Sequence, residues 1–221
     1  MIIPPLDPTT ILPPLIEAVK AFLPKIGAAI AKFVAKIPPP IMERVITVTI
    51  EVIADLAKRF LGCSDSPAEL GEKAMNAEKK PEDFDSINSY IKYLEKEQKI
   101  ADPEAFKNLT PEEKRERELA GTEIYRQGIS EKIGFDVSDD FLIFCGKVGL
   151  DAKTVYLILD AIQKNKVITL SDFCDFFAGS IQPEKAKPTS DFCKTVFSTG
   201  TSSGPEVNEK ILSIMEEARK V

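Results

Sequence analysis

The sequence predicts an all-α fold, a bundle of short helices preceded by a Pro-rich, apolar and amphipathic N-terminal helical region. Three observations support this prediction. Apolar side chains recur every three or four residues through most of the chain, which is the period of an amphipathic helix. Helix start signals occur at residues 66–69 (SPAE) and 110–113 (TPEE), where an N-cap hydroxyl precedes proline and glutamate. Apolar residues make up 43% of the 221 residues, which is enough to bury a sizeable core.

The first predicted helical segment covers residues 12–37. Its apolar residues lie three or four positions apart, so they share one face of a helix. Pro24 has no backbone N–H, which predicts a kink or a break into two helices. We call this apolar face the N-terminal stripe, and we take it as the candidate interaction surface: Ile16, Val19, Leu23, Ile26, Ile30, Phe33, Val34 and Ile37.

A second segment covers residues 41–61, after a stiff corner formed by the three prolines at 38–40. Residues 45–52 fit two interpretations, because apolar and polar residues alternate as in a strand while the apolar positions also fit a helix. A lone strand in a helical chain would have no partner. We therefore predict a helix here.

The rest of the chain predicts short helices with clear boundaries. Gly134 and Gly149 fall where helix C-caps are expected. Ser, Thr, Gly and Pro predict a loop over most of residues 180–204, with one helical turn around residues 191–197. The predicted helices are residues 67–78, 86–98, 103–108, 111–133, 138–148, 151–164, 170–179 and 205–219.

Charge and proline content divide the chain near Gly62. Residues 1–62 carry seven basic and five acidic side chains, a net charge of +2. The whole chain has a net charge of −6, so residues 63–221 have a net charge of −8. Nine of the 16 prolines lie in the first 40 residues. We therefore predict an N-terminal assembly or interfacial region at residues 1–62 and an acidic helical body at residues 63–221. We expect the body to fold without the N-terminal region.

Composition argues against several chemistries. The chain has no histidine, which excludes Ser-His-Asp and Cys-His catalysis and every His-containing metal site. Its four cysteines form no CxxC pair and are expected to be free thiols. Residues 158–177 have the hydrophobic rhythm of an EF-hand, but they lack its acidic ligands and its central glycine. The net negative charge disfavours nucleic acid as a partner. We therefore expect no enzymatic activity, no cofactor and no metal ion.

Two functional hypotheses remain for the N-terminal stripe. In the first, the stripe packs on the acidic body, on a second copy or on a protein partner, and the chain is a structural or adaptor protein. In the second, the same basic amphipathic segment lies on a membrane surface, as in peripheral or pore-forming proteins. Charged residues interrupt both segments and disfavour a transmembrane span. The first ten residues contain no Lys or Arg, so no signal peptide is expected and a cytoplasmic location is predicted.

Overall fold

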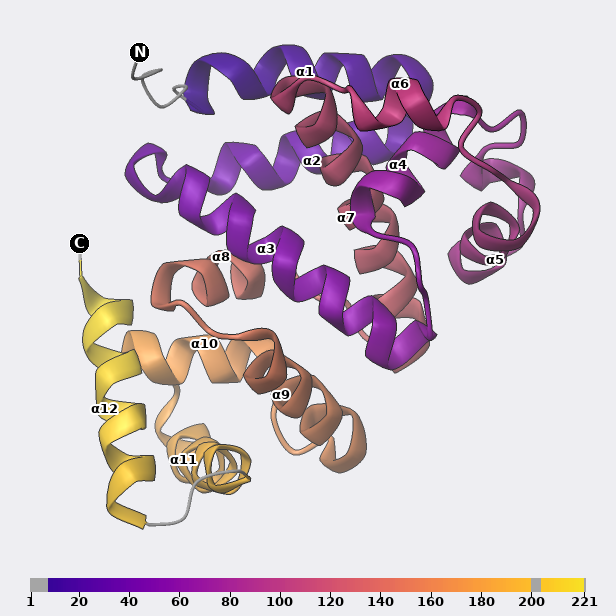
Figure 1. Cartoon of the computed structure of the whole chain (residues 1–221). Coiled ribbons are helices and arrows are strands. Elements are labelled where there is room, and N and C mark those ends of the chain that lie inside the picture. The colour runs from indigo at the N-terminus through magenta and orange to yellow at the C-terminus, as the bar shows by residue number, and fades with distance from the viewer. Residues whose placement is uncertain (1–7, 200–203, 221) are drawn as a thin grey trace.

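The all-α prediction is confirmed. The computed structural model describes residues 8–199 and 204–220, and within these ranges it contains twelve α-helices and no strand (Figure 1). The α-helices are α1 (Pro8–Phe22), α2 (Pro24–Lys36), α3 (Met42–Leu56), α4 (Pro67–Asn76), α5 (Ile87–Glu97), α6 (Pro103–Lys107), α7 (Pro111–Ile133), α8 (Asp139–Val148), α9 (Ala152–Asn165), α10 (Leu170–Ala178), α11 (Pro183–Ser198) and α12 (Gly204–Arg219). Three single turns accompany them: η1 (Pro39–Ile41) and η3 (Pro81–Asp83) are 3-10 turns, and η2 (Ala57–Leu61) is a π-helical turn.

Local signals place most helix boundaries as predicted. The chain breaks at Pro24, which begins α2 directly after α1 ends at Phe22. Residues 45–52 lie inside α3, so the helical interpretation of this stretch is confirmed. Ser66 and Thr110 both form capping boxes, in which the N-cap side chain and the glutamate at the third helical position bond each other's backbone.

The loop predicted for residues 180–204 is wrong over most of its length, because α11 occupies Pro183–Ser198. Pro183 takes the first helical position, where its missing N–H costs nothing, and Pro188 lies inside the helix. The apolar residues Cys193, Val196 and Phe197 are buried on one face that packs against α9, α10 and α12. Burial of this face outweighs the low helix propensity of the Ser and Thr residues. Residues 200–203 of the predicted loop lie outside the described residues.

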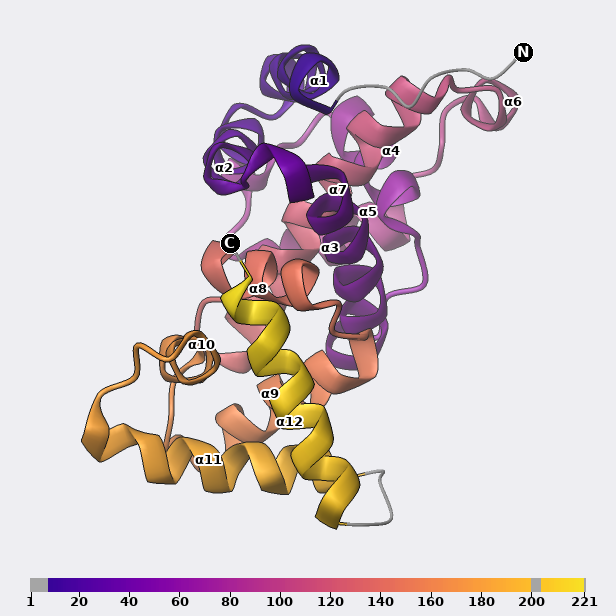
Figure 2. The same ribbon diagram turned by 90° about the vertical axis from the view of Figure 1, so that its left-hand side faces the viewer.

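Helix α7 is the centre of the N-terminal part of the molecule. It packs along α4 and also contacts α1, α2, α3 and α5 (Figure 1). Helix α3 extends from α7 to α8 and α9, and so connects this part to the last five helices. In Figure 2, α11 forms the foot of the molecule, and α12 runs from it toward α8, which it contacts.

The hydrophobic core continues across the predicted boundary at Gly62. Gly62 ends η2 in the left-handed conformation, with φ at 73°, so a turn does lie at this position. However, one cluster of buried residues contains Val19 and Ile26 from the N-terminal region together with Ile124 and Phe141 from the body. Ion pairs also join the two parts, as between Lys36 and Asp139 at 3.0 Å. This continuity argues against the independent folding of the body that the composition predicts.

Candidate functional site

All eight residues of the N-terminal stripe are buried within their own chain. Their exposures range from 0% at Val19 to 9% at Val34. Helices α1 and α2 pack against each other and against α7. The stripe belongs to one buried cluster with residues of α3, α7 and α8. The stripe therefore completes the core by packing on the body, and it offers no free surface to a partner or a lipid in this conformation. Periodicity identifies a face that will be buried, but it does not identify what buries it.

Because the stripe is buried, the same segment has no exposed apolar face with which to contact a membrane in this conformation. Within the described residues, no helix combines the length and the apolar character that crossing a membrane requires. Among residues 8–199 and 204–220, three large apolar side chains are exposed to solvent, and they lie on separate helices or turns: Phe22, Val167 and Leu212. Scattered single residues of this kind are ordinary on a protein surface.

A buried charge network lies between α2, α7 and α8. Arg126 donates two hydrogen bonds of 2.8 Å to the carboxylate of Glu123, which is 5% exposed, and a third of 2.9 Å to the Val137 carbonyl. Its guanidinium also lies 3.3 Å from Asp139, whose other oxygen pairs with Lys36. Burial lowers the pKa of Arg126, but the nearby carboxylates of Glu123 and Asp139 raise it by more, so the pKa of Arg126 lies above its ordinary value. Every charge in this network has a partner, which is the arrangement of a structural network.

The four cysteines are free thiols in this fold. Burial raises the pKa of Cys63, Cys174 and Cys193 to about 12, and it raises the pKa of Cys145 well above its ordinary value. A thiol needs to be ionised to act as a nucleophile or to bind a metal ion. In residues 8–199 and 204–220, no cluster of three or more Cys, Asp or Glu side chains could hold a metal ion. The thiols therefore act as small apolar groups in the core.

A pocket of about 540 Å³ opens between the α7–α8 turn and the α9–α10 turn, and we call it the two-turn pocket. Its lining consists of Ile133, Gly134, Phe135, Asp136, Ser138, Ile162, Gln163, Lys166, Ile168, Thr169, Leu170 and Ser171. The aliphatic residues of this set are buried and form an apolar floor, whereas the polar residues form the rim.

Four helix ends shape the two-turn pocket. Helices α7 and α9 end there in left-handed residues, Gly134 with φ at 83° and Lys166 with φ at 49°. Helices α8 and α10 begin there, with N-caps at Ser138 and Thr169. Lys166 adopts a conformation that costs roughly 1–2 kcal/mol for a residue with a Cβ. The turns are therefore built so that each helix stops at the pocket instead of filling it.

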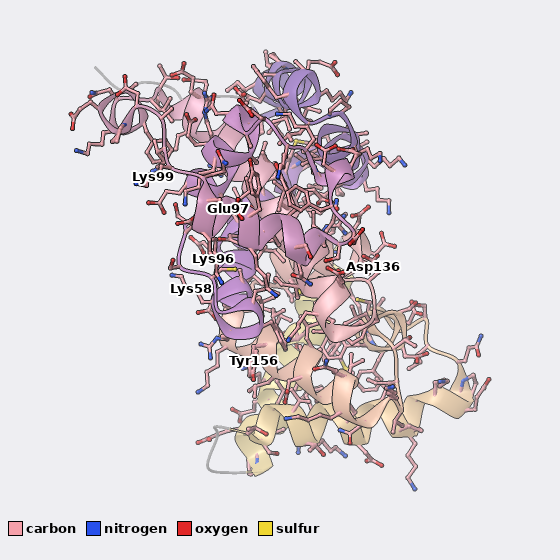
Figure 3. The ribbon with its side chains drawn as sticks, turned by 90° about the vertical axis from the view of Figure 1, so that its right-hand side faces the viewer. Lys58, Lys96, Glu97, Lys99, Asp136 and Tyr156 are labelled. Atoms are coloured by element: carbon pink, nitrogen blue, oxygen red, sulfur yellow. The ribbon has the colours of Figure 1, made fainter. Side chains whose placement is uncertain are left out.

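The rim of the two-turn pocket carries opposite charges on its two sides. Asp136, in the α7–α8 turn, has a side chain that is 73% exposed, although one of its oxygens lies 3.8 Å from the Arg126 guanidinium, and it lies on the face shown in Figure 3. Lys166, in the α9–α10 turn, is also exposed. Neutral polar residues, among them Gln163 and Ser171, complete the rim. An apolar floor inside a polar, charged rim suits recognition of a ligand with both characters.

The sequence pattern predicted the two helices that form one wall of this pocket, but it did not predict the pocket. The sequence predicts helices at residues 151–164 and 170–179, on either side of the turn in the EF-hand-like stretch, and α9 and α10 confirm them. The opposite wall, from Ile133 to Ser138, lies about 30 residues earlier, and only the tertiary structure brings the two turns together. No signal in the sequence would have paired them.

A second surface feature gathers basic side chains from both predicted regions. Lys58 of η2 lies on one edge of the molecule together with Lys96 and Glu97 at the end of α5 and Lys99 just after it (Figure 3). The division into a basic region and an acidic body therefore holds along the chain but not across the surface. Exposed lysines of this kind are mostly solvated, and they identify no ligand.

Comparison of this chain with protein-family models, with curated proteins and with solved structures finds no match.

Proposed function

We propose that this chain is a non-enzymatic adaptor that binds a segment of a protein partner in the two-turn pocket. The observation that carries the proposal is the pocket itself, a hollow of about 540 Å³ with a buried apolar floor and a charged rim. Pockets that bind ligands typically have volumes of about 300–1,000 Å³ and mostly apolar linings with a few placed polar groups. The N-terminal stripe, in contrast, is buried in the core and is not accessible to a partner in this conformation.

The charges on the rim define the kind of segment that fits. An apolar side chain would enter the floor beside Ile162 and Leu170. The residue on one side of this anchor would face Asp136, and the residue on the other side would face Lys166. We therefore propose a segment in which a large apolar residue is flanked by Lys or Arg on one side and by Asp or Glu on the other.

The same proposal includes a cytoplasmic location. Four free thiols, three of them buried, are typical of proteins in a reducing compartment. Their raised pKa values also protect them from oxidation, because the thiolate is the reactive form.

The proposal is tested by selecting binders from a random peptide library with the full chain and measuring their affinity by fluorescence polarisation. Ser171→Arg places a long side chain at the mouth of the pocket and should weaken binding by about tenfold or more, since a buried apolar anchor is worth about 1.5–3 kcal/mol. The matched control is Leu212→Arg, because Leu212 is 58% exposed on α12, away from the pocket. This variant should bind as the unmodified chain does.

A charge exchange makes the test specific. The double variant Asp136→Lys with Lys166→Glu should lose the selected peptides and should bind versions of them in which the two flanking charges are exchanged. Selected peptides that bind the Ser171→Arg variant equally well would refute the proposal. A dimer that Ser171→Arg converts to a monomer would show that a second copy supplies the segment. Binding of small apolar compounds in place of any peptide would identify the pocket as a small-molecule site and would also refute it.

A further inference from the structure

We infer that a single buried water molecule bridges α3 and α7 beside the Glu123–Arg126 pair. The inference begins with two threonine hydroxyls. Thr49 of α3 and Thr122 of α7 are 5% and 6% exposed, and neither hydroxyl has a hydrogen-bond partner within the described residues. A buried hydroxyl without a partner is costly, so such groups normally bond to protein or to ordered water.

Both hydroxyls belong to the lining of one small cavity. This cavity has a volume of about 20 Å³ and lies between α2, α3, α7 and α8. Its remaining lining is aliphatic or aromatic apart from Glu123 and Arg126. A cavity of ~10–15 Å³ is enough for one water molecule, provided that the water has two to four polar partners. The size of the cavity therefore excludes larger ligands, and its polar groups match a single water.

The hydrogen-bonding capacity of the cavity agrees with this assignment. The Glu123 carboxylate already accepts three hydrogen bonds, two from Arg126 and one from Gln127 at 2.8 Å. A carboxylate has about four acceptor positions, so one remains. A water that bonds Thr49, Thr122 and Glu123 would make three hydrogen bonds, the usual number for a buried water. All three groups would then be satisfied.

This water would join the two regions that composition separates. Thr49 belongs to residues 1–62, whereas Thr122 and Glu123 belong to the body. The contact lies beneath the stripe residues Ile30 and Phe33, which also line the cavity. The water would therefore connect α3 to α7 within the core. The Lys36–Asp139 ion pair, which joins α2 to α8, lies nearer the surface.

The inference is tested by whether Thr→Val substitutions at the cavity lower or raise the melting temperature. Valine has nearly the shape of threonine without the hydroxyl. If a water bridges the hydroxyls, Thr49→Val and Thr122→Val should each lower the melting temperature by about 2–4 °C, the loss expected for a hydrogen bond in a chain of this size. Because both hydroxyls would bond the same water, the melting temperature of the double variant should decrease by less than the sum of the decreases in the two single variants.

The matched control is Thr189→Val in α11. The Thr189 hydroxyl is also buried without a partner, but it lies outside this cavity. Its removal should leave the melting temperature unchanged or raise it. A direct readout is the nuclear Overhauser effect between water and the methyl groups of Thr49 and Thr122 in the full chain. A rise in stability in either cavity variant, or the absence of these water contacts, would overturn the inference.

Discussion

Replacing Gly121 by alanine should force α4 and α7 apart. These two helices make the most extensive helix–helix contact of the molecule, and they approach each other through glycines. A Cβ added at Gly121 would lie 1.9 Å from the carbonyl oxygen of Pro67, and one added at Gly71 would lie 2.0 Å from that of Arg117. Real Cβ contacts do not fall below 3.0 Å, and a backbone oxygen cannot rotate away. Helix α4 would therefore have to retreat by about 1 Å.

The magnitude follows from two opposing effects. Alanine is favoured over glycine in a helix interior by about 1 kcal/mol. Overpacking costs typically 1–3 kcal/mol and more where the obstacle cannot move. Because the obstacle is backbone on a shared core, we place the overpacking cost at the top of this range or above it, ~3–4 kcal/mol. Subtracting the gain of about 1 kcal/mol leaves a net loss of about 2–3 kcal/mol, or roughly 4–12 °C in melting temperature.

The assay is thermal and urea unfolding followed by circular dichroism. The control is Gly204→Ala, because a Cβ at Gly204, the first residue of α12, would meet no atom of the described residues within 4 Å. This variant should be neutral or slightly stabilised. A Gly121→Ala protein as stable as the unmodified chain would show that α4 and α7 do not cross as closely as described, and the packing argument would fail.

Three further predictions concern the core and its charges. Arg126→Met should destabilise the chain by about 3–5 kcal/mol in urea unfolding, because it leaves the buried Glu123 unpaired, whereas the exposed Arg59→Met should cost less than about 1 kcal/mol. Burial raises the pKa of Glu116 above its ordinary value, so the fold favours the protonated acid, and the stability of the fold decreases as pH rises through the folded-state pKa. Glu116→Gln should therefore raise the melting temperature at pH 7, with an advantage that shrinks as the pH falls through the folded-state pKa; an equal gain at pH 7 and in acid would contradict this. A chain beginning at Ser64 should melt without cooperativity, and a sharp transition would show that the body folds alone.

The positions of the helices could be predicted from the sequence because their signals are local. Pro24 breaks the first segment, Ser66 and Thr110 cap α4 and α7, and Gly134 ends α7 in the left-handed conformation. Each of these effects depends on the few residues around it. The one large error, at α11, arose where a Ser- and Thr-rich composition predicted a loop and the apolar face of Val196 and Phe197 decided otherwise.

The tertiary structure alone decided which surfaces remain free. The sequence by itself determined that Ile26, Ile30 and Phe33 share a face that must be buried, since the helical period places them together. It did not determine that α3, α7 and α8 would bury them, nor that turns about 30 residues apart would form one pocket. Periodicity is a property of one helix, whereas a partner face or a pocket is a property of two or more, and it depends on how the chain brings them together. For this reason the N-terminal stripe lies inside the core, and the accessible apolar hollow lies at the two-turn pocket.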